Sequence, residues 1–210
     1  MCCVMGYTGH DLSAEKFKEY LLRTVDRGPD DQRVVEGPYG LMGFGRLAIM
    51  GLTPEGMQPF YRGADCVVCN GELYGFRFEK EILKRRGYKF CSDCDCEILL
   101  PLYYEYGLDM FRHMDAEFAL ILYDSRKDRL IAARDPIGIR PLFYGYSKSS
   151  HKIAFSSEMR NLIAGAMISV PSLSAATTAT AALCATRTLR MCPPPCRTIC
   201  PPSCRTSAKS

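Results

Sequence analysis

The sequence predicts an α+β fold built from antiparallel sheets, because strand-like and helical segments alternate and the strands are joined by short connections. The strand-like blocks span residues 39–51, 65–70, 117–133 and 141–156, and the helical patterns span residues 13–25, 76–86 and 96–106. Short connections are typical of hairpins, whereas parallel strands need long crossovers. About 160 residues suffice for one domain with a sizeable core.

The helix at residues 13–25 is predicted from an apolar stripe that includes Phe17, Tyr20 and Leu21. Glu15 lies in its first turn, where a negative charge is favourable, and Gly28-Pro29 ends it.

The other two helices are predicted to stop at glycines, Gly87 and Gly107. Pro101 falls inside the third helix and is expected to kink or shorten it, because proline lacks the amide hydrogen that an inner turn needs.

Two segments read locally as hairpins. Residues 117–123 and 129–133 form strand-like runs on either side of a turn at 124–128. Asn70-Gly71 lies between two apolar runs, and by itself this dipeptide favours a type I′ hairpin turn.

The composition changes sharply after Ile163. Residues 164–210 contain no Asp or Glu, five Lys or Arg, six Pro and five Cys. Such a stretch cannot bury a core, so we expect a disordered or out-of-frame tail. The first 163 residues hold 22 of the 27 basic residues and all 23 acidic ones. Their net charge of −1 therefore predicts no nucleic-acid surface.

Cys2 offers a nucleophile and a base on one residue if Met1 is removed. A free α-amine has a pKa of about 7.7–8, so it can accept the thiol proton near neutral pH.

Further motifs follow Cys2 in a fixed order. They are Arg27-Gly28-Pro29-Asp30, Gly45-Arg46-Leu47-Ala48-Ile49, Asn70-Gly71-Glu72-Leu73-Tyr74, Cys94-Asp95-Cys96-Glu97 and Arg134-Asp135-Pro136-Ile137-Gly138-Ile139-Arg140-Pro141-Leu142-Phe143. Together they resemble the class II glutamine amidotransferase domain, specifically the amino-terminal half of a glutamine-hydrolysing asparagine synthetase. The resemblance runs from Met1 to about Ile163.

The resemblance implies a four-layer αββα sandwich of antiparallel sheets, of the N-terminal nucleophile hydrolase type, over residues 1–163. It implies that glutamine is hydrolysed through a thioester on Cys2, with an oxyanion hole made by the Asn70 side chain and the Gly71 amide. One such donor can contribute about 3 kcal/mol to the transition state. The loop at 27–30 would shape the site around the amino terminus, and residues 134–136 read as scaffold.

The residues expected to bind glutamine are Arg46, Leu47, Ala48, Ile49, Met50, Asn70, Gly71, Glu72 and Asp95. Arg46 suits the α-carboxylate, because a guanidinium donates two parallel hydrogen bonds to it. The resemblance matches Asp95 to the α-ammonium group. Taken alone, Arg46 could pair with a surface acid, Glu72 could be a solvated carboxylate, and Asp95 could be a first-turn acid of a helix.

The expected reaction supplies ammonia for the amidation of aspartate, with a glutamine amidotransferase that uses another acceptor as the alternative. The chain itself should hold no cofactor and no metal, since ATP and magnesium would belong to a missing or separate synthetase domain. We expect a cytoplasmic enzyme, because there is no apolar signal segment or membrane-spanning run. The resemblance also admits a homodimer.

The competing hypothesis is a zinc- or thiol-binding module. Cys66-x2-Cys69 and Cys91-x2-Cys94 have the spacing of a four-thiolate site, and the tail offers another cluster at Cys192, Cys196, Cys200 and Cys204. However, Cys66 and Cys69 lie in one strand-like run at an odd separation, which directs them to opposite faces.

Overall fold

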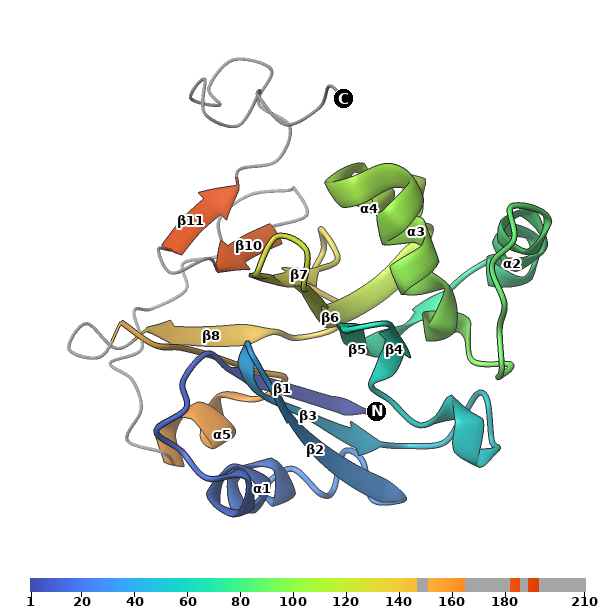
Figure 1. Cartoon of the computed structure of the whole chain (residues 1–210). Coiled ribbons are helices and arrows are strands. Elements are labelled where there is room, and N and C mark those ends of the chain that lie inside the picture. Colours follow the sequence, from blue (N-terminus) through green and yellow to red (C-terminus); the bar gives the residue numbers. More distant parts are fainter. Residues whose placement is uncertain (147–150, 165–181, 186–188, 193–210) are drawn as a thin grey trace.

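Two antiparallel sheets stack face to face, and helices cover their outer faces (Figure 1). The computed structural model describes residues 1–146, 151–164, 182–185 and 189–192. The two sheets with their outer helices make the four-layer αββα arrangement, so the fold predicted from the resemblance is confirmed.

The first sheet has the order β2-β3-β1-β9-β8. Its strands are β1 (Cys3–Tyr7), β2 (Asp31–Gly37), β3 (Gly40–Arg46), β8 (Phe143–Tyr146) and β9 (Ile153–Ser156). Helices α1 (Ala14–Leu22) and α5 (Met159–Ala164) cover its outer face. The central strand β1 is buried along its whole length, which holds the chain just after Cys2 in a fixed place.

The second sheet has the order β11-β10-β7-β6-β5-β4. Its strands are β4 (Phe60–Arg62), β5 (Asp65–Leu73), β6 (Ala116–Asp124), β7 (Arg129–Arg134), β10 (Ala182–Ala185) and β11 (Leu189–Cys192). On its outer side lie α2 (Phe76–Arg85), α3 (Leu99–Tyr106) and α4 (Met110–His113). Short 3₁₀ helices occupy Pro54–Gly56 (η1), Asp95–Ile98 (η2) and Gly107–Asp109 (η3).

Buried side chains form an apolar layer between the two sheets and another beneath each set of helices. Phe44, Val68 and Phe155 belong to the layer between the sheets. Phe17 and Leu21 lie beneath α1, which confirms the predicted helix stripe, and Ser13 caps that helix by accepting the Lys16 N–H.

Pro101 is accommodated because the α-helix starts later than predicted. Residues Asp95–Ile98 form the 3₁₀ helix η2, and α3 begins only at Leu99. Pro101 therefore lies in the first turn, where a backbone N–H has no partner within the helix. The predicted shortening is observed.

The local prediction of a hairpin turn at Asn70-Gly71 is wrong. Both residues lie inside β5, where Asn70 is opposite Ala119 and Gly71 opposite Phe118 on β6. Pairing along the full length of the predicted 117–123 strand overrides the local turn preference. The other predicted hairpin, with strands at 117–123 and 129–133, is confirmed, because β6 pairs with β7 across residues 124–129.

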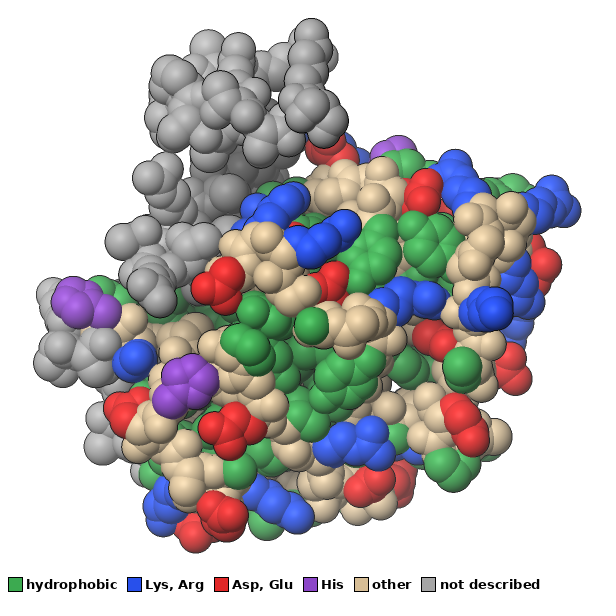
Figure 2. All heavy atoms as spheres, in the orientation of Figure 1, with side chains coloured by type: hydrophobic (Ala, Val, Ile, Leu, Met, Phe, Trp, Pro, Cys, Tyr) green, Lys and Arg blue, Asp and Glu red, His purple; other side chains and the backbone are tan. Residues whose placement is uncertain are grey.

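The predicted tail lies mostly outside the described residues, so its nature stays a prediction. Two short strands within it are described: β10 pairs with β7, and β11 pairs with β10. Acidic and basic side chains are interspersed on the visible face of the domain, around a group of hydrophobic side chains at its centre (Figure 2). Among the described residues, no helix has the length and apolar character needed to cross a membrane.

Candidate functional site

A pocket opens where the start of β1 meets the ends of β3 and β5. It is lined by Met1, Cys2, Phe44, Arg46, Leu47, Ile49, Met50, Gly56, Gln58, Cys69, Asn70, Gly71, Glu72, Cys94, Asp95, Cys96 and Arg140. The Cys2 thiol lies against the backbone of Leu47, whose N–H donates to Sγ at 3.4 Å and whose carbonyl is 3.5 Å away. The nucleophile predicted from the sequence therefore faces a pocket.

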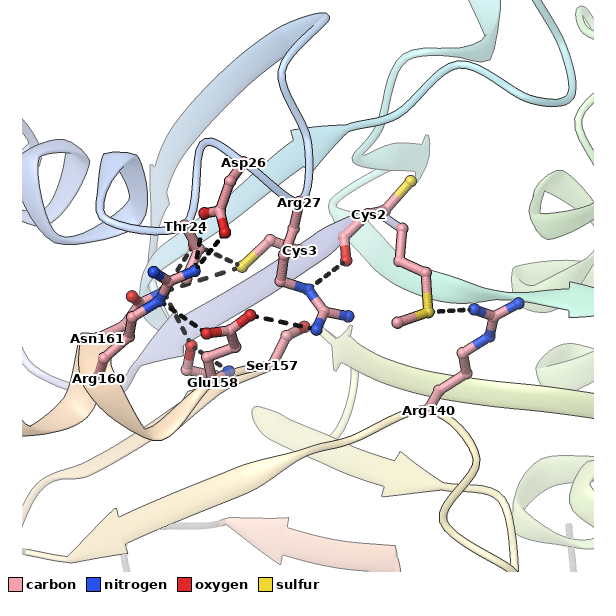
Figure 3. Close-up of polar contacts among 12 residues, drawn as sticks. Cys2, Cys3, Thr24, Asp26, Arg27, Arg140, Ser157, Glu158, Arg160 and Asn161 are labelled. Carbon is pink, nitrogen blue, oxygen red and sulfur yellow. Dashed lines mark hydrogen bonds and ion pairs between the residues drawn. The ribbon is translucent and has the colours of Figure 1, made fainter.

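Arg27 holds the main chain of Cys2 in place through a hydrogen bond (Figure 3). Its Nε donates to the Cys2 carbonyl at 3.3 Å, and its Nη1 pairs with Glu158 at 3.3 Å. Through these contacts the 27–30 loop positions the main chain of Cys2.

Buried polar groups anchor the next residues of β1. The Cys3 thiol lies 3.1 Å from the Thr24 hydroxyl, and the Asn161 amide donates to that hydroxyl at 3.0 Å. The Ser157 hydroxyl accepts the Val4 N–H, and the Ser157 N–H donates to the Val4 carbonyl. Figure 3 shows these groups gathered behind Cys2. Cys3 is thus a structural residue, and only its neighbour Cys2 reaches the pocket.

The 27–30 loop also clamps the end of β3. Asp30 accepts the Ala48 N–H at 2.7 Å, and its own N–H donates to the Arg46 carbonyl at 3.0 Å. Gly28 is needed here, because a Cβ would lie 2.3 Å from the carbonyl carbon of Gly45.

The later part of β5, which β4 does not cover, forms another wall of the pocket. β4 pairs only with the first three residues of β5, so the later N–H groups on that edge need other partners. The Cys69 N–H donates to the Gln58 side chain at 2.6 Å, and the Leu73 N–H donates to Asp95 at 2.8 Å. Alternation along the strand directs the Gly71 N–H between them to the same edge.

Asn70 lies on the face of β5 that looks toward the first sheet. Its side chain is only 3% exposed, and among the described residues Nδ2 has no hydrogen-bond partner. An unpaired buried donor costs roughly 1–3 kcal/mol. Since Asn70 lines the pocket together with Cys2, its amide can serve a bound acceptor there.

Arg46 is buried at the pocket wall, and the loop after β3 holds it in place. Its Nη2 donates to the carbonyl of Gly51 and, at 3.2 Å, to that of Thr53. The alternative drawn from the local sequence is that Arg46 pairs with a surface acid. Its Nη2 group instead binds main-chain carbonyls. A fixed cation at a pocket wall is suited to a carboxylate.

Asp95 lies opposite, at the start of η2. Its side chain is 3% exposed, Oδ2 accepts the Leu73 N–H, and Oδ1 lies 3.6 Å from the Cys94 thiol. The pKa of Cys94 is raised by its hydrogen bond with Cys96 and by burial. Burial also raises the pKa of Cys2, which the Leu47 N–H opposes.

Arg140 reaches the pocket from the loop that follows β7. It pairs with Glu117 and donates to the Met1 sulfur. Asp135 holds that loop, accepting the N–H groups of Gly138 at 2.6 Å and of Ile139 and Arg140 at 3.0 Å. Burial acts to raise the pKa of Asp135, but these hydrogen bonds outweigh it and lower the pKa. Asp135 therefore acts as scaffold, as predicted.

Comparison with known proteins matches residues 1–191 to a family described as the glutamine amidotransferase domain. The chain belongs to this glutamine amidotransferase domain family. It is 38% identical over 166 residues to a probable glutamine-hydrolysing asparagine synthetase of Acanthamoeba polyphaga mimivirus, covering 76% of this chain and 30% of the relative. It is 38% identical over 181 residues to amidase chry2 of Gibberella zeae, covering 78% and 26%.

A solved structure shares the fold of this glutamine amidotransferase domain. It is the glutamine phosphoribosylpyrophosphate amidotransferase of B. subtilis complexed with ADP and GMP, with a TM-score of 0.65 at 20% identity. The match covers 77% of this chain and 43% of that one. The chain thus spans about a third or less of the length of the curated relatives described above.

The glutamine amidotransferase domain brings the predicted site residues to one pocket, with a single exception. Ala48 is not among the lining residues, because its N–H is directed to Asp30. Glu72 is exposed and lies opposite Glu117 on β6. The roles assigned to these residues stay predictions.

Sequence reasoning did not include Arg140, Gln58, Cys69, Cys94 and Cys96 among the site residues. Arg140, Cys94 and Cys96 lie in motifs of the ordered series, and this was a usable signal. Gln58 and Cys69 lie outside those motifs, and only tertiary packing brings them to the pocket.

The four-thiolate alternative conflicts with the strand geometry. Cys66 packs between the sheets, whereas Cys69 packs beneath the helices with Cys94. The two thiols on β5 therefore point away from each other, as predicted from their odd separation.

Proposed function

We propose that this domain hydrolyses the side-chain amide of glutamine, with Cys2 as the nucleophile after removal of Met1. The unpaired amide of Asn70, buried in the pocket that Cys2 lines, carries the proposal. A buried donor with no partner in the protein is what an oxyanion hole needs, because it is ready for the charge that develops in the reaction.

The first half of the reaction forms a thioester. The free α-amine of Cys2 takes the thiol proton, and the sulfur attacks the amide carbon. The oxyanion that forms accepts hydrogen bonds from the Asn70 amide and the Gly71 N–H. The intermediate collapses as the amine returns the proton to the leaving nitrogen, which departs as ammonia.

The second half releases glutamate. Water attacks the thioester carbon while the α-amine accepts its proton, the same two donors hold the second oxyanion, and the thiol leaves with that proton. Removal of Met1 also frees part of the pocket, since Met1 is one of its lining residues.

Arg46 and Asp95 are the proposed anchors for the amino-acid head group. The guanidinium would bind the α-carboxylate, and the Asp95 oxygen not used by Leu73 would accept a hydrogen bond from the α-ammonium group. Leu47, Ile49 and Met50 line the pocket beside Arg46, and Glu72 lies at its exposed side.

Similarity to the mimivirus protein supports aspartate as the final acceptor of ammonia, with a synthetase domain as partner. In this proposal ATP and magnesium act on that domain, in the cytoplasm, and the pocket described here needs neither. The equally identical fungal amidase favours a second candidate, an amidotransferase with another acceptor.

The test is to assay glutamate release from glutamine by the purified chain, after mass spectrometry has shown that Met1 is removed. We expect glutamate and ammonia in equal amounts. A chain that begins with Cys2 and does not turn over glutamine would contradict the proposal.

A further inference from the structure

Three cysteines and a carboxylate meet at the wall of the pocket formed by β5 and η2. The ligand atoms of Cys94, Asp95 and Cys96 all lie within 4.8 Å of one another. Cys69, on β5, lies outside this group of three but packs in the same buried cluster as Cys94 and Cys96. All four residues line the pocket, although each is at most 6% exposed.

The geometry suits a tetrahedral thiophilic cation. Zinc–sulfur bonds are about 2.3 Å long, so two ligands of a tetrahedral zinc ion lie about 3.8 Å apart. The three side chains at 94–96 are already within about 1 Å of that spacing. Asp95 is oriented by the Leu73 N–H on Oδ2, and Oδ1 accepts only a long thiol hydrogen bond from Cys94, which is lost when that thiol is deprotonated to bind a cation.

We propose that Cys94, Cys96 and Asp95, with Cys69 as fourth ligand, bind a thiophilic divalent cation of the zinc class next to the nucleophile. The ion forms bonds to three sulfurs and one carboxylate oxygen, and the thiol protons leave to solvent. This set differs from the four-thiolate motif in the sequence, because Cys66 faces the other side of β5 and Cys91 is exposed.

Binding of the cation and of glutamine should be mutually exclusive. This consequence rests on the proposed function, in which the same oxygen of Asp95 holds the substrate's ammonium group. The cation would therefore act as a competitive inhibitor of glutamine hydrolysis, although it takes no part in the reaction.

Titration of the full chain with Co²⁺ alone tests the site without any activity assay. We expect an ultraviolet thiolate-to-cobalt absorption in which about one ion per chain depends on Cys94 and Cys96. The double variant Cys94→Ser/Cys96→Ser should lose affinity by more than about 100-fold. The matched control Cys66→Ser, on the opposite face of β5, should bind as the parent chain does. No thiolate absorption, or equal binding by parent and double variant, would overturn the proposal.

Alkylation provides a second readout if the double variant does not fold. Iodoacetamide labelling in intermediate urea, where buried thiols become accessible, should show by mass spectrometry that Zn²⁺ slows modification of Cys69, Cys94 and Cys96 in the parent chain. Exposed Cys91 should be labelled equally with and without the ion. Equal labelling of all four would overturn the site. Zn²⁺ that binds but inhibits without competing with glutamine would overturn mutual exclusion. A chain that binds Co²⁺ but never hydrolyses glutamine contradicts only the proposed function.

Discussion

At the residue scale, Asn70 shows how a stability cost identifies a site. Its buried amide has no partner among the described residues, although most buried donors in folded proteins have one. The Nδ2 group of Asn161, in contrast, donates to Thr24 and Ser156, and only its Oδ1 has no partner among the described residues. Asparagine therefore serves a different purpose at each of the two positions. The hydrogen bonds of Asn161 stabilise the fold, whereas the Asn70 amide is left for a bound acceptor.

This contrast predicts opposite outcomes for two alanine variants. Asn70→Ala should lower kcat for glutamine hydrolysis by about 10²–10³-fold and leave the free energy of unfolding unchanged or higher. Asn161→Ala should instead lower that free energy by about 1–3 kcal/mol with a much smaller effect on kcat. Urea unfolding and steady-state kinetics measure both. Destabilisation of the Asn70 variant without loss of kcat would refute the oxyanion role.

Cys2 and Cys3 provide a second matched pair, because only the first lines the pocket. Cys2→Ala should abolish glutamate release with little change in Tm, since a half-buried terminal thiol contributes little packing. Cys3→Ala should lower Tm through loss of a buried contact with Thr24 and retain measurable turnover. Turnover and thermal unfolding are compared after the mass of each chain is checked for removal of Met1. Normal turnover by Cys2→Ala would rule out this nucleophile.

At the element scale, the close approach of β5 and β6 requires glycine at position 71. A Cβ there would lie 2.6 Å from the Glu117 carbonyl oxygen and 2.9 Å from the Phe118 Cβ. The strand can therefore present the residue 71 N–H to the pocket only without a side chain.

Gly71→Ala should lower both stability, by about 1–3 kcal/mol, and kcat, because β5 must shift away from β6. Gly45→Ala is the control, since a Cβ on β3 would meet its nearest neighbour, the Cys3 Cβ, at 3.5 Å. Urea unfolding and glutaminase kinetics measure the two effects. If the two variants lose the same stability and the same kcat, the close approach of β5 and β6 is not the reason that position 71 requires glycine.

The loop after β7 depends on one carboxylate, and this gives a pH prediction. The pKa of Asp135 is lowered in the folded state, so its contribution is complete above the ordinary aspartate pKa of about 3.9 and is lost as the pH falls below it. Asp135→Asn should be about 1–3 kcal/mol less stable than the parent at pH 7. The difference should shrink at pH 3, as urea unfolding at both pH values will show. A difference that does not depend on pH would contradict the charged role.

At the scale of the whole molecule, the pocket exists only because two sheets stack. Cys2 precedes the central strand of one sheet, and Asn70 lies in the other. The chain spans 30% of the length of the mimivirus relative. In the proposed function, the ammonia acceptor is activated on a synthetase domain or partner.

Incubation of this chain with glutamine, aspartate, ATP and magnesium should therefore produce glutamate without asparagine and without ATP consumption. The proposed pocket has residues to attack an amide and none assigned to activating aspartate. Amino-acid analysis and an ATP assay measure these products, and a separately expressed synthetase partner is the positive control. Stoichiometric asparagine from this chain alone would contradict the proposal that aspartate is activated on a separate synthetase domain or partner.

The sequence by itself determined the features that depend on near neighbours. The stripe of α1, the hairpin of β6 and β7, and the opposite orientations of Cys66 and Cys69 follow from helical and strand periodicity. The ordered motifs were sufficient for the family, because each keeps its chemistry within a few consecutive residues.

Only the tertiary structure decided what depends on pairing between distant segments. The Asn70-Gly71 dipeptide favours a turn locally, yet β6 holds it extended in β5. Arg140 reaches Met1 across 139 residues of sequence, and η2 brings Cys94 and Cys96 to Cys69. Such contacts carry no local signal, since they follow from how the two sheets and the helices stack, and this stacking is a property of the whole chain.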